Sequence, residues 1–289
     1  MKLLTMAGEP WADYGLLDSG NGCKLERYGP HRFIRPEPQA LWAPAGADWR
    51  AAGEFVPGSD EEGGGQWRFA EPVPRAGWPL SWREVRFTAQ TTPFRHLGFF
   101  PDMAPVWSWM RERLDGVAEP EVMNLFGYTG VGTLALAAKG ARMVHVDASK
   151  KSVEAARANA KLSGLADRPV RWIVEDAAKF TAREVRRNRR YDGIFLDPPK
   201  YGRGPEGEVW RLEEHLPALV ADCRRLLDDR SRFLFLTVYA VRMSALAIGE
   251  MLRQVFADLP GSVEAGELGV REEARGLVLP TAIWARWSR

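Results

Sequence analysis

From residue 121 onward, short apolar runs alternate with longer segments in which apolar residues return every three or four positions. Short runs predict buried strands, and the longer spacing predicts amphipathic helices. We expect strands at 84–88, 121–125, 142–146, 170–174, 191–196, 233–239, around 263 and at 277–284. We expect helices at 105–114, 130–139, 150–162, 178–188, 210–228 and 245–257. Strands separated by helices predict right-handed crossovers, and therefore an α/β fold with a doubly wound, mostly parallel sheet.

Residues 1–84 have a different texture, with many prolines and tryptophans. Turn sequences such as 19–22 and the polar, Gly-rich stretch 58–65 separate short apolar pieces. This pattern predicts a small β-rich module with hairpins. An irregular arm wrapped on the main domain is an equally good interpretation. We therefore expect a small N-terminal module at 1–84 and a larger domain at 85–289.

Three glycines follow the expected strand at 121–125, at positions 127, 130 and 132. Without a Cβ, they allow a tight turn in which the backbone and the amino terminus of the next helix approach a ligand closely. The segment 130–135 also fits the G-x-G-x-x-A pattern of dinucleotide-binding folds. The glycines alone therefore predict a nucleoside-binding loop without choosing the cofactor.

Two acids follow the next two expected strands. Asp147 ends the strand at 142–146, where a carboxylate is placed to accept hydrogen bonds from ribose hydroxyls. Asp176 follows the strand at 170–174, where it can accept from an adenine amine while Ala177 leaves space for the ring. Both acids therefore belong to the expected nucleoside site.

The tetrapeptide Asp197-Pro198-Pro199-Lys200 follows the fourth strand of the expected sheet. Two successive prolines hold φ near about −65° and lack N–H groups, so the loop is stiff and its carbonyls are acceptors. Asp197 and the carbonyl of Pro198 are placed to orient an amine and to accept its developing positive charge. A plain surface turn with a solvated lysine is the alternative.

Together these features favour methyl transfer from S-adenosylmethionine (SAM). NAD is the competing cofactor because of the pattern at 130–135. Gly127 lies earlier than that fingerprint requires, and NAD binding gives no reason for an Asp-Pro-Pro-Lys loop at 197–200.

Over about residues 92–239 the chain resembles class I SAM-dependent methyltransferases, and within them the bacterial large-subunit ribosomal RNA methyltransferases. Besides the features above, the segment 94–103 looks like that family's Lys-Thr-Gly-x-Phe-x-Asp-Gln-Arg segment, which lies over the cofactor. Gly98, Phe100 and Asp102 agree with it, whereas 95–97 and Met103 depart. The resemblance implies a Rossmann-like, seven-stranded sheet whose last strand is antiparallel.

The motifs and the resemblance together define the expected site. Expected SAM contacts come from His96, Gly98, Phe100, Asn124, Phe126, Gly127, Tyr128, Thr129, Gly130, Asp147, Ala148, Ser149, Asp176, Ala177 and Asp197. The acceptor is expected at Asp197, Pro198, Pro199 and Lys200. His96 is expected to position the cofactor and not to act as a base. No metal site is expected.

The absence of a suitable cysteine narrows the acceptor. Some relatives methylate cytosine at carbon 5, which requires a cysteine thiolate. Neither 197–203 nor 233–240 contains one, and Cys223 falls inside an expected helix. A base nitrogen in ribosomal RNA is therefore the expected acceptor, by analogy of fold. A protein side chain, a small molecule, a non-catalytic SAM- or nucleotide-binding module and an NAD-dependent oxidoreductase are the alternatives.

Composition adds little to this picture. The 40 basic and 38 acidic residues leave a formal net charge of +2, so charge does not by itself mark a nucleic-acid binder. The two cysteines lack metal or disulfide spacing, which favours a reducing cytoplasm. No apolar stretch reaches the about 20 residues of a membrane span, and none at the amino terminus is long enough for a signal peptide. The sequence does not decide whether the protein forms a homo-oligomer.

Two local features have both a functional and an ordinary interpretation. The arginines between 183 and 190 either grip phosphates or form a solvated helix face. Tyr201 and Trp210 flank the Gly-rich loop 202–207, where they either stack on a flat substrate or belong to the core.

Overall fold

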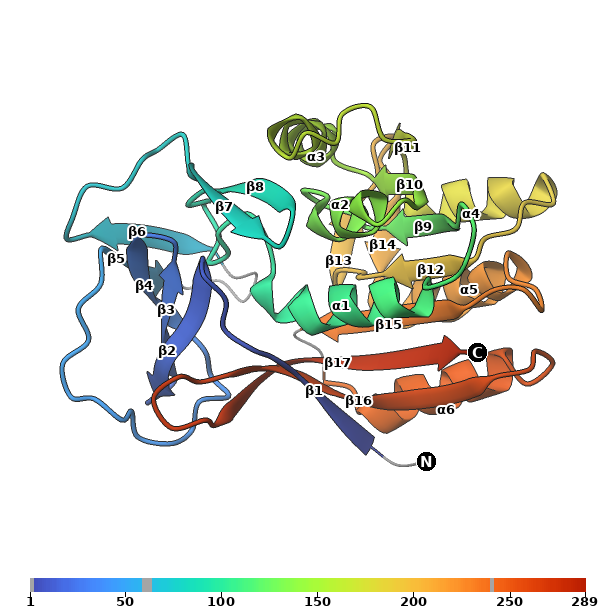
Figure 1. Ribbon diagram of the computed structural model, residues 1–289. Helices are drawn as coiled ribbons and strands as arrows, with labels where there is room; N and C mark the ends of the chain where they lie inside the picture. The colour runs from blue at the N-terminus through green and yellow to red at the C-terminus, as the bar shows by residue number, and fades with distance from the viewer. Residues whose placement is uncertain (1–2, 59–63, 240–241) are drawn as a thin grey trace. The chain divides into compact units, whose positions relative to one another are not determined.

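The computed structural model describes the whole chain except residues 1–2, 59–63 and 240–241, so part of the Gly-rich stretch 58–65 lies outside the described residues. The chain forms two compact units (Figure 1). Unit 1 comprises residues 1–6, 106–268 and 282–289, and unit 2 comprises residues 7–105 and 269–281. The division expected at 84/85 falls inside a β-hairpin of unit 2, made of β7 (Trp78–Trp82) and β8 (Val85–Ala89).

Unit 1 is built on an eight-stranded sheet in the order β1-β16-β17-β15-β12-β9-β10-β11. Its central strands pair in parallel, whereas β17 runs antiparallel to β15. The predicted α/β fold with a doubly wound, mostly parallel sheet is therefore confirmed. The strands are β1 (Leu3–Gly8), β9 (Glu121–Leu125), β10 (Arg142–Asp147), β11 (Val170–Val174), β12 (Gly193–Leu196), β15 (Phe233–Tyr239), β16 (Ser262–Arg271) and β17 (Val278–Ser288).

The sheet has one strand more than the seven that we expected. The additional strand, β1, lies at the edge beside β16. Gly266 of β16 allows this approach, because a Cβ there would overlap the carbonyl oxygen of Leu4. The N-terminal segment therefore contributes to the sheet of unit 1 and not only to the β-rich module.

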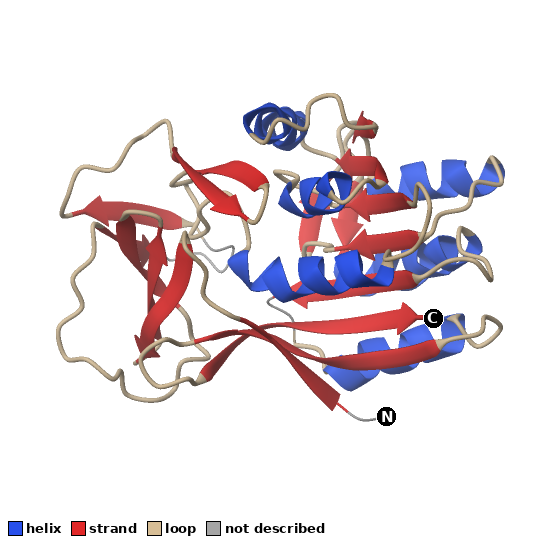
Figure 2. Cartoon of the chain, in the orientation of Figure 1, coloured by secondary structure: helices blue, strands red, loops and turns tan. Residues whose placement is uncertain are grey.

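Helices cover both faces of the sheet in unit 1 (Figure 2). On one face, Met123 and Leu125 of β9 belong to a buried apolar cluster with residues of α4, α5 and α6. On the other face, Gly132 of α2 lies close to Trp107 of α1 and to β12. The helices are α1 (Ala104–Arg113), α2 (Val131–Ala138), α3 (Lys150–Leu162), α4 (Ala177–Arg186), α5 (Leu212–Arg225) and α6 (Ala245–Val255), with a 3₁₀ turn at Pro101–Met103.

A hairpin that we did not expect follows the fourth strand of the predicted sheet. It pairs β13 (Tyr201–Arg203) with β14 (Val209–Arg211), and α5 begins only at Leu212. The segment 202–207, expected to be a loop, thus forms part of a two-stranded ribbon. The cause is a turn in which the Gly204 N–H donates to the Glu208 carbonyl, at 2.8 Å.

Unit 2 is β-rich, as residues 1–84 predicted. Besides β7 and β8 it holds a five-stranded sheet, in which Asn21 and Gly22 have left-handed φ values of 51° and 75° and close the first hairpin. The strands are β2 (Tyr14–Gly20), β3 (Cys23–Tyr28), β4 (His31–Pro36), β5 (Gly53–Pro57) and β6 (Gly65–Phe69).

A charged cluster is buried inside unit 2. Glu26 pairs with Arg35 through bonds of 2.7 and 2.8 Å, and its Oε1 also accepts from the Tyr14 hydroxyl at 2.8 Å. Arg35 donates onward to the Arg95 carbonyl at 2.9 Å. Although burial opposes ionisation, Arg35 and Lys24 hold the pKa of Glu26 at about 2. The pair therefore ties β3 and β4 to the segment at residue 95.

None of the helices in the described residues combines the length and the apolar character needed to cross a bilayer.

Candidate cofactor and acceptor site

The register of the parallel strands brings the expected site residues of unit 1 to one edge of the sheet. Leu125 of β9 lies opposite Val146 of β10 and Leu196 of β12, so the chain leaves these three strands at the same level. β9 lies between β10 and β12, where the strand order reverses. Ligands of open α/β sheets bind at such a switch point, beyond the carboxyl ends of the strands.

The loop after β9 holds three residues in the left-handed region. Phe126, Tyr128 and Gly130 have φ values of 58°, 48° and 80°. For a residue with a side chain, such a conformation costs about 1–3 kcal/mol and is found most often at functional sites. From the sequence we expected this freedom only of the glycines, and not the strained backbone of Phe126 and Tyr128.

A hydrogen-bond network holds this loop in place. The Gly127 N–H donates to the Val146 carbonyl and the Gly130 N–H to the Gly127 carbonyl, each at 3.0 Å. The Thr129 carbonyl accepts from the amide of Asn159 on α3 at 2.9 Å. The loop is therefore fixed by β10 and α3 as well as by its own turn.

His145 lies directly beneath the loop and explains why residue 127 is glycine. A Cβ at that position would be 2.5 Å from His145 Nδ1. The imidazole is buried, its Nδ1 lies 2.9 Å from the Thr133 hydroxyl, and burial lowers its pKa to about 3, so it is neutral at pH 7. Asn124, an expected cofactor contact, is also buried here and donates to the Thr133 hydroxyl at 2.8 Å. We did not expect His145 from the sequence, in which its only signal is its place two residues before Asp147 in a buried strand.

Asp147 connects the loop to the next strand. Its Oδ2 accepts from the Tyr128 N–H and its Oδ1 from the Ser149 N–H, each at 2.8 Å. These two bonds orient the carboxylate, yet burial raises its pKa above the ordinary value. Burial and the nearby Asp147 also raise the pKa of the Tyr128 phenol to about 12, so that side chain is neutral. Ala148 is half-buried, and the Ser149 hydroxyl caps α3 by accepting from the Ser152 N–H at 3.2 Å.

Asp176 and Ala177 are both buried where α4 begins. Asp176 Oδ1 accepts from the Lys179 N–H at 2.9 Å, which makes Asp176 the N-cap of α4. An N-cap aspartate stabilises a helix by about 1 kcal/mol, so this residue has a structural function in addition to the expected one.

The 197–200 loop leaves β12 beside the glycine loop and is anchored through two of its carbonyls. The Pro199 carbonyl accepts from the Trp210 indole at 2.7 Å, and the Lys200 carbonyl accepts from the Leu212 N–H at 3.0 Å. Within the described part of the chain, no donor reaches the Pro198 carbonyl. Asp197 is half-buried and Pro198 buried, whereas Pro199 and Lys200 are exposed. The stiffness expected from two prolines is thus reinforced by the β13–β14 hairpin.

Trp210 joins the two loops. Its ring is buried and lies 5.1 Å from that of Phe126, while its indole N–H donates to the Pro199 carbonyl of the 197–200 loop. Of the two aromatic residues proposed to flank a flat substrate, Trp210 is therefore a core residue. Tyr201 is exposed.

Three of the expected cofactor contacts belong to unit 2. Gly98 has a left-handed φ of 90°, and the His96 ring lies 5.8 Å from Phe94 and 5.7 Å from Phe100. Burial, together with the charges of Arg35 and Arg95, lowers the pKa of His96 to about 4. His96 is therefore neutral at pH 7, which fits a positioning role. Its contact with a cofactor stays a prediction.

The arginines of 183–190 are largely engaged with carboxylates. Arg183 pairs with Glu175 at 2.5 Å, Arg187 with Glu184 at 3.2 Å, and Arg189 with Glu121. These ion pairs favour the interpretation of a solvated helix face over that of a phosphate-binding site. No cluster of metal-binding side chains is found among the described residues.

Cys223 is not placed to act as a nucleophile. Its thiol is completely buried in the apolar cluster of unit 1, and this burial raises its pKa well above the ordinary value. A thiolate at this position is therefore unfavourable at neutral pH.

Comparisons with known proteins agree with this geometry. Residues 57–228 match the profile of the family described as S-adenosylmethionine-dependent methyltransferase. A crystal structure of a SAM-dependent methyltransferase from Agrobacterium tumefaciens is 42% identical, has a TM-score of 0.93, and the match covers 99% of this chain and 93% of that one. The crystal structure of SMU.776 complexed with SAH, 15% identical with a TM-score of 0.74, shares the fold over 96% of this chain and 75% of its own.

Among curated proteins, the ribosomal RNA large subunit methyltransferase K/L of Magnetococcus marinus is 31% identical over 157 residues, which are 53% of this chain and 21% of that protein. The chain thus spans about a fifth of the length of the curated relatives that it matches. The family match decides between the two cofactors that the glycines left open, in favour of SAM over NAD. The chain belongs to the S-adenosylmethionine-dependent methyltransferases.

Proposed function

We propose that the protein transfers the methyl group of SAM to a base nitrogen in RNA. The observation that carries this proposal is the anchored 197–200 loop beside the glycine loop, with a half-buried carboxylate at Asp197 and the Pro198 carbonyl facing no donor of the described residues. The names of the curated relatives, ribosomal RNA large subunit methyltransferases, support RNA as the substrate.

The residues at the strand ends fit a nucleoside cofactor. Each Asp147 oxygen receives one backbone N–H and retains a lone pair, so the carboxylate is oriented and can still accept from ribose hydroxyls. The 127–132 backbone would hold the methionine portion, because residue 127 has no side chain and the loop leads into the amino terminus of α2. Asp176 would accept from the adenine amine beside Ala177. The cofactor contacts of His96, Gly98 and Phe100 rest on the resemblance of 94–103 alone.

The 197–200 loop, which we call the acceptor loop, would position the substrate. SAM supplies an electrophilic methyl group on a sulfonium, and the protein has to present a nucleophile in line with it. Asp197 and the Pro198 carbonyl would accept hydrogen bonds from an exocyclic amine and direct its lone pair outward. As the amine gains positive charge, these two acceptors stabilise it until its proton is lost. Lys200, exposed beside them, would face the phosphates of the substrate.

The same loop argues against methylation at carbon 5 of a pyrimidine. That chemistry begins with attack of a cysteine thiolate on the base. The described chain contains Cys23 in unit 2 and the buried Cys223, and neither belongs to the loops at the strand ends. A nitrogen acceptor needs only orientation and the loss of a proton.

Nucleoside mass spectrometry of ribosomal RNA from cells with and without the gene tests this function. We expect one N-methylated nucleoside to disappear in the deletion strain and to return when the gene is restored. In vitro, the purified protein with labelled SAM should transfer label to total RNA from the deletion strain. Label in the protein or metabolite pool instead of RNA, or the loss of a 5-methylated pyrimidine, would show that the proposal is wrong.

A further inference from the structure

The β13–β14 hairpin has one buried side and one exposed side. Tyr201 pairs with Arg211 and Arg203 with Val209, so these four side chains share one face, and all four residues are exposed. Gly202 and Trp210 form the other pair and point to the opposite side, where Trp210 is buried. We call the exposed side, formed by Tyr201, Arg203, Val209 and Arg211, the hairpin face.

The hairpin is held at both ends. At its base, Trp210 packs on Phe126 and bonds the Pro199 carbonyl. At its tip, Lys179 of α4 pairs with Glu206 at 2.8 Å and also with Glu208. A surface that is already ordered loses little conformational entropy when it binds a partner. The hairpin face is therefore a preformed platform next to the acceptor loop.

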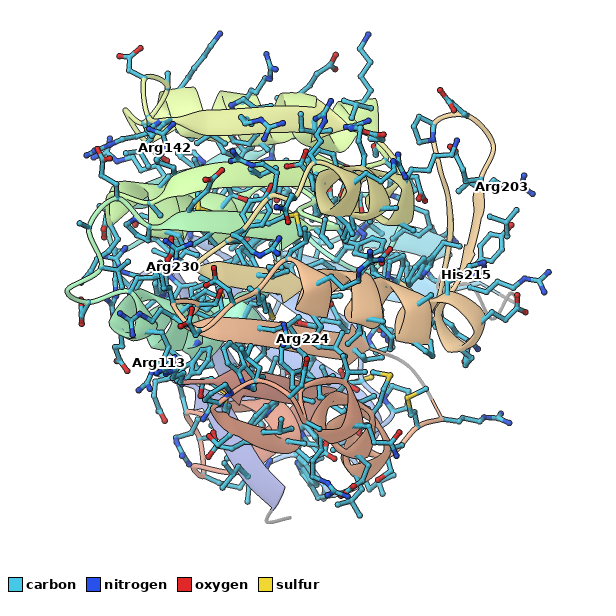
Figure 3. The ribbon with its side chains drawn as sticks, turned by 90° about the vertical axis from the view of Figure 1, so that its right-hand side faces the viewer. Arg113, Arg142, Arg203, His215, Arg224 and Arg230 are labelled. Carbon is cyan, nitrogen blue, oxygen red and sulfur yellow. The ribbon has the colours of Figure 1, made fainter. Side chains whose placement is uncertain are left out.

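The charges of this region suit a polyanion. Within the described residues, Lys200 and Arg203 form no ion pair, whereas both carboxylates at the hairpin tip pair with Lys179, which offsets one of their two negative charges. Arg211 pairs with Glu214 at 3.1 Å on the exposed surface, where such a pair is weak and exchanges readily for a phosphate. Figure 3 shows Arg203 on the projecting hairpin, its side chain directed away from the sheet.

The hairpin face also carries an exposed aromatic ring and an exposed aliphatic side chain. Tyr201 is 48% exposed and Val209 43%. An exposed aromatic ring beside arginine side chains is the combination with which proteins hold single-stranded nucleic acids, since the ring stacks on a base while the cations follow the backbone. In a duplex the bases are stacked on one another and do not reach such a ring.

We propose that the hairpin face binds unpaired RNA immediately next to the methylated base, with Tyr201 stacked on a neighbouring base and Arg203 on a phosphate. This inference rests on the proposed function, because Tyr201 directly follows the acceptor loop in the chain. The substrate class is therefore a base in a single-stranded segment of RNA. Tyr201 and Arg203 are the residues that select single-stranded over double-stranded RNA.

Binding of a short, fluorescently labelled single-stranded RNA of mixed sequence, followed by anisotropy over a range of salt concentrations, tests the proposal. Tyr201→Ala should weaken binding about tenfold without changing the salt dependence, and Tyr201→Phe should bind as the wild type does. Arg203→Ala should reduce the slope of log affinity against log salt by about 0.7, the value for one phosphate contact with a single strand. Arg142→Ala is the matched control: it removes an exposed arginine at the start of β10, at the opposite end of the strands, and should change neither quantity.

Calorimetry with SAM should give wild-type affinity for all four variants, which shows that they are folded. If the wild type binds the RNA and Tyr201→Ala and Arg203→Ala bind it equally well, the hairpin proposal is wrong while the RNA acceptor stands. If a duplex of the same sequence binds as tightly and with the same sensitivity to these substitutions, the assignment of a single strand is wrong. If labelled SAM instead modifies protein or metabolites, the proposed function itself fails, whatever the hairpin binds.

Discussion

Among single residues, the geometry of the site depends most on Gly127, which has no side chain, and on the carboxylate of Asp147. Gly127 leaves room for His145, whereas Phe126 and Tyr128 accept a left-handed backbone although they carry large side chains. The strain is offset by bonds to Val146 and Asp147. The conformation of the loop is therefore set by contacts within the protein.

Gly127→Ala should weaken SAM binding by at least about tenfold, because the new Cβ cannot coexist with the His145 ring unless the loop moves. Isothermal calorimetry measures the affinity. Gly46→Ala is a suitable control, since a Cβ there would lie 3.6 Å from Asp18 Oδ2, an ordinary contact. Wild-type affinity in Gly127→Ala would contradict the role given to His145.

The affinity for SAM should fall as the pH falls through the pKa of Asp147. Burial raises that pKa above its ordinary value of 3.8, so charging Asp147 in the folded protein is unfavourable and the loss begins at a higher pH than for an exposed aspartate. Only the ionised form leaves both oxygens as acceptors for ribose hydroxyls, so below the pKa the affinity should drop about tenfold per pH unit. Calorimetry at a series of pH values measures this. Asp147→Asn should bind weakly at every pH; a pH profile in this variant like that of the wild type would assign the titration to another group.

At the scale of elements, strand register and two anchored segments build the site. β9, β10 and β12 end at one level, and the β13–β14 hairpin holds the 197–200 loop through Trp210. In unit 2, the buried Glu26–Arg35 pair connects neighbouring strands in the same way. Both interactions join segments that no local sequence pattern connects.

Asp197→Asn should lower kcat by about 100-fold while leaving SAM affinity within a few-fold of the wild type, since the charge is lost but the size of the side chain is kept. Turnover is followed with labelled SAM and RNA, and affinity by calorimetry. The matched change Asp192→Asn, at the start of the same strand, should not affect kcat. Loss of SAM binding with unchanged kcat in Asp197→Asn would assign this carboxylate to the cofactor and not to the acceptor.

Glu26→Gln should destabilise unit 2 by about 3–5 kcal/mol, because Arg35 would remain buried without its counter-charge. The folded pKa of Glu26 is depressed from 4.5 to about 2, so its contribution to stability is complete above about pH 4.5 and is lost as the pH falls toward 2. Denaturant unfolding at neutral and acidic pH measures both effects. The double variant Glu26→Gln, Arg35→Met should recover part of the loss; if it is as unstable as the sum of the single changes, the two side chains are not coupled.

In the whole molecule, the chain passes more than once between the two compact units. The first strand, β1, and the final pair of strands, β16 and β17, each contribute residues to both units. Residues 1–6 belong to unit 1 although they precede the β-rich module, and 269–281 belong to unit 2 although they lie between two strands of the main sheet. A boundary drawn at one point of the sequence cannot describe such a chain.

SAM should raise the free energy of unfolding of the protein by about 2.7 kcal/mol at a concentration 100 times its Kd, because it binds only the folded form. NAD at the same concentration should have no effect. Thermal unfolding followed by fluorescence measures the shift, with Asp147→Ala as a variant in which the SAM effect disappears. A shift with NAD and none with SAM would overturn the cofactor assignment.

The alternation of strands and helices, the α/β class and the positions of the motifs at strand ends can all be read from the sequence. These are local properties: β9, α3, β11 and β15 begin and end at the predicted residues because burial periodicity and caps act within a few residues. The positions of Asp147 and Asp197 at the ends of buried strands are also visible in the chain, whereas their roles toward ribose and acceptor stay predictions.

The contacts that support those motifs cannot be read from the chain. His145 beneath Gly127, Trp210 between two loops, the eighth strand and the exposed hairpin face all depend on contacts between segments far apart in the chain. Their energies come from packing and from buried hydrogen bonds, which leave no periodic signal. The sequence therefore shows which loops follow the strand ends, while packing between distant segments determines what holds these loops and which side of the hairpin is exposed.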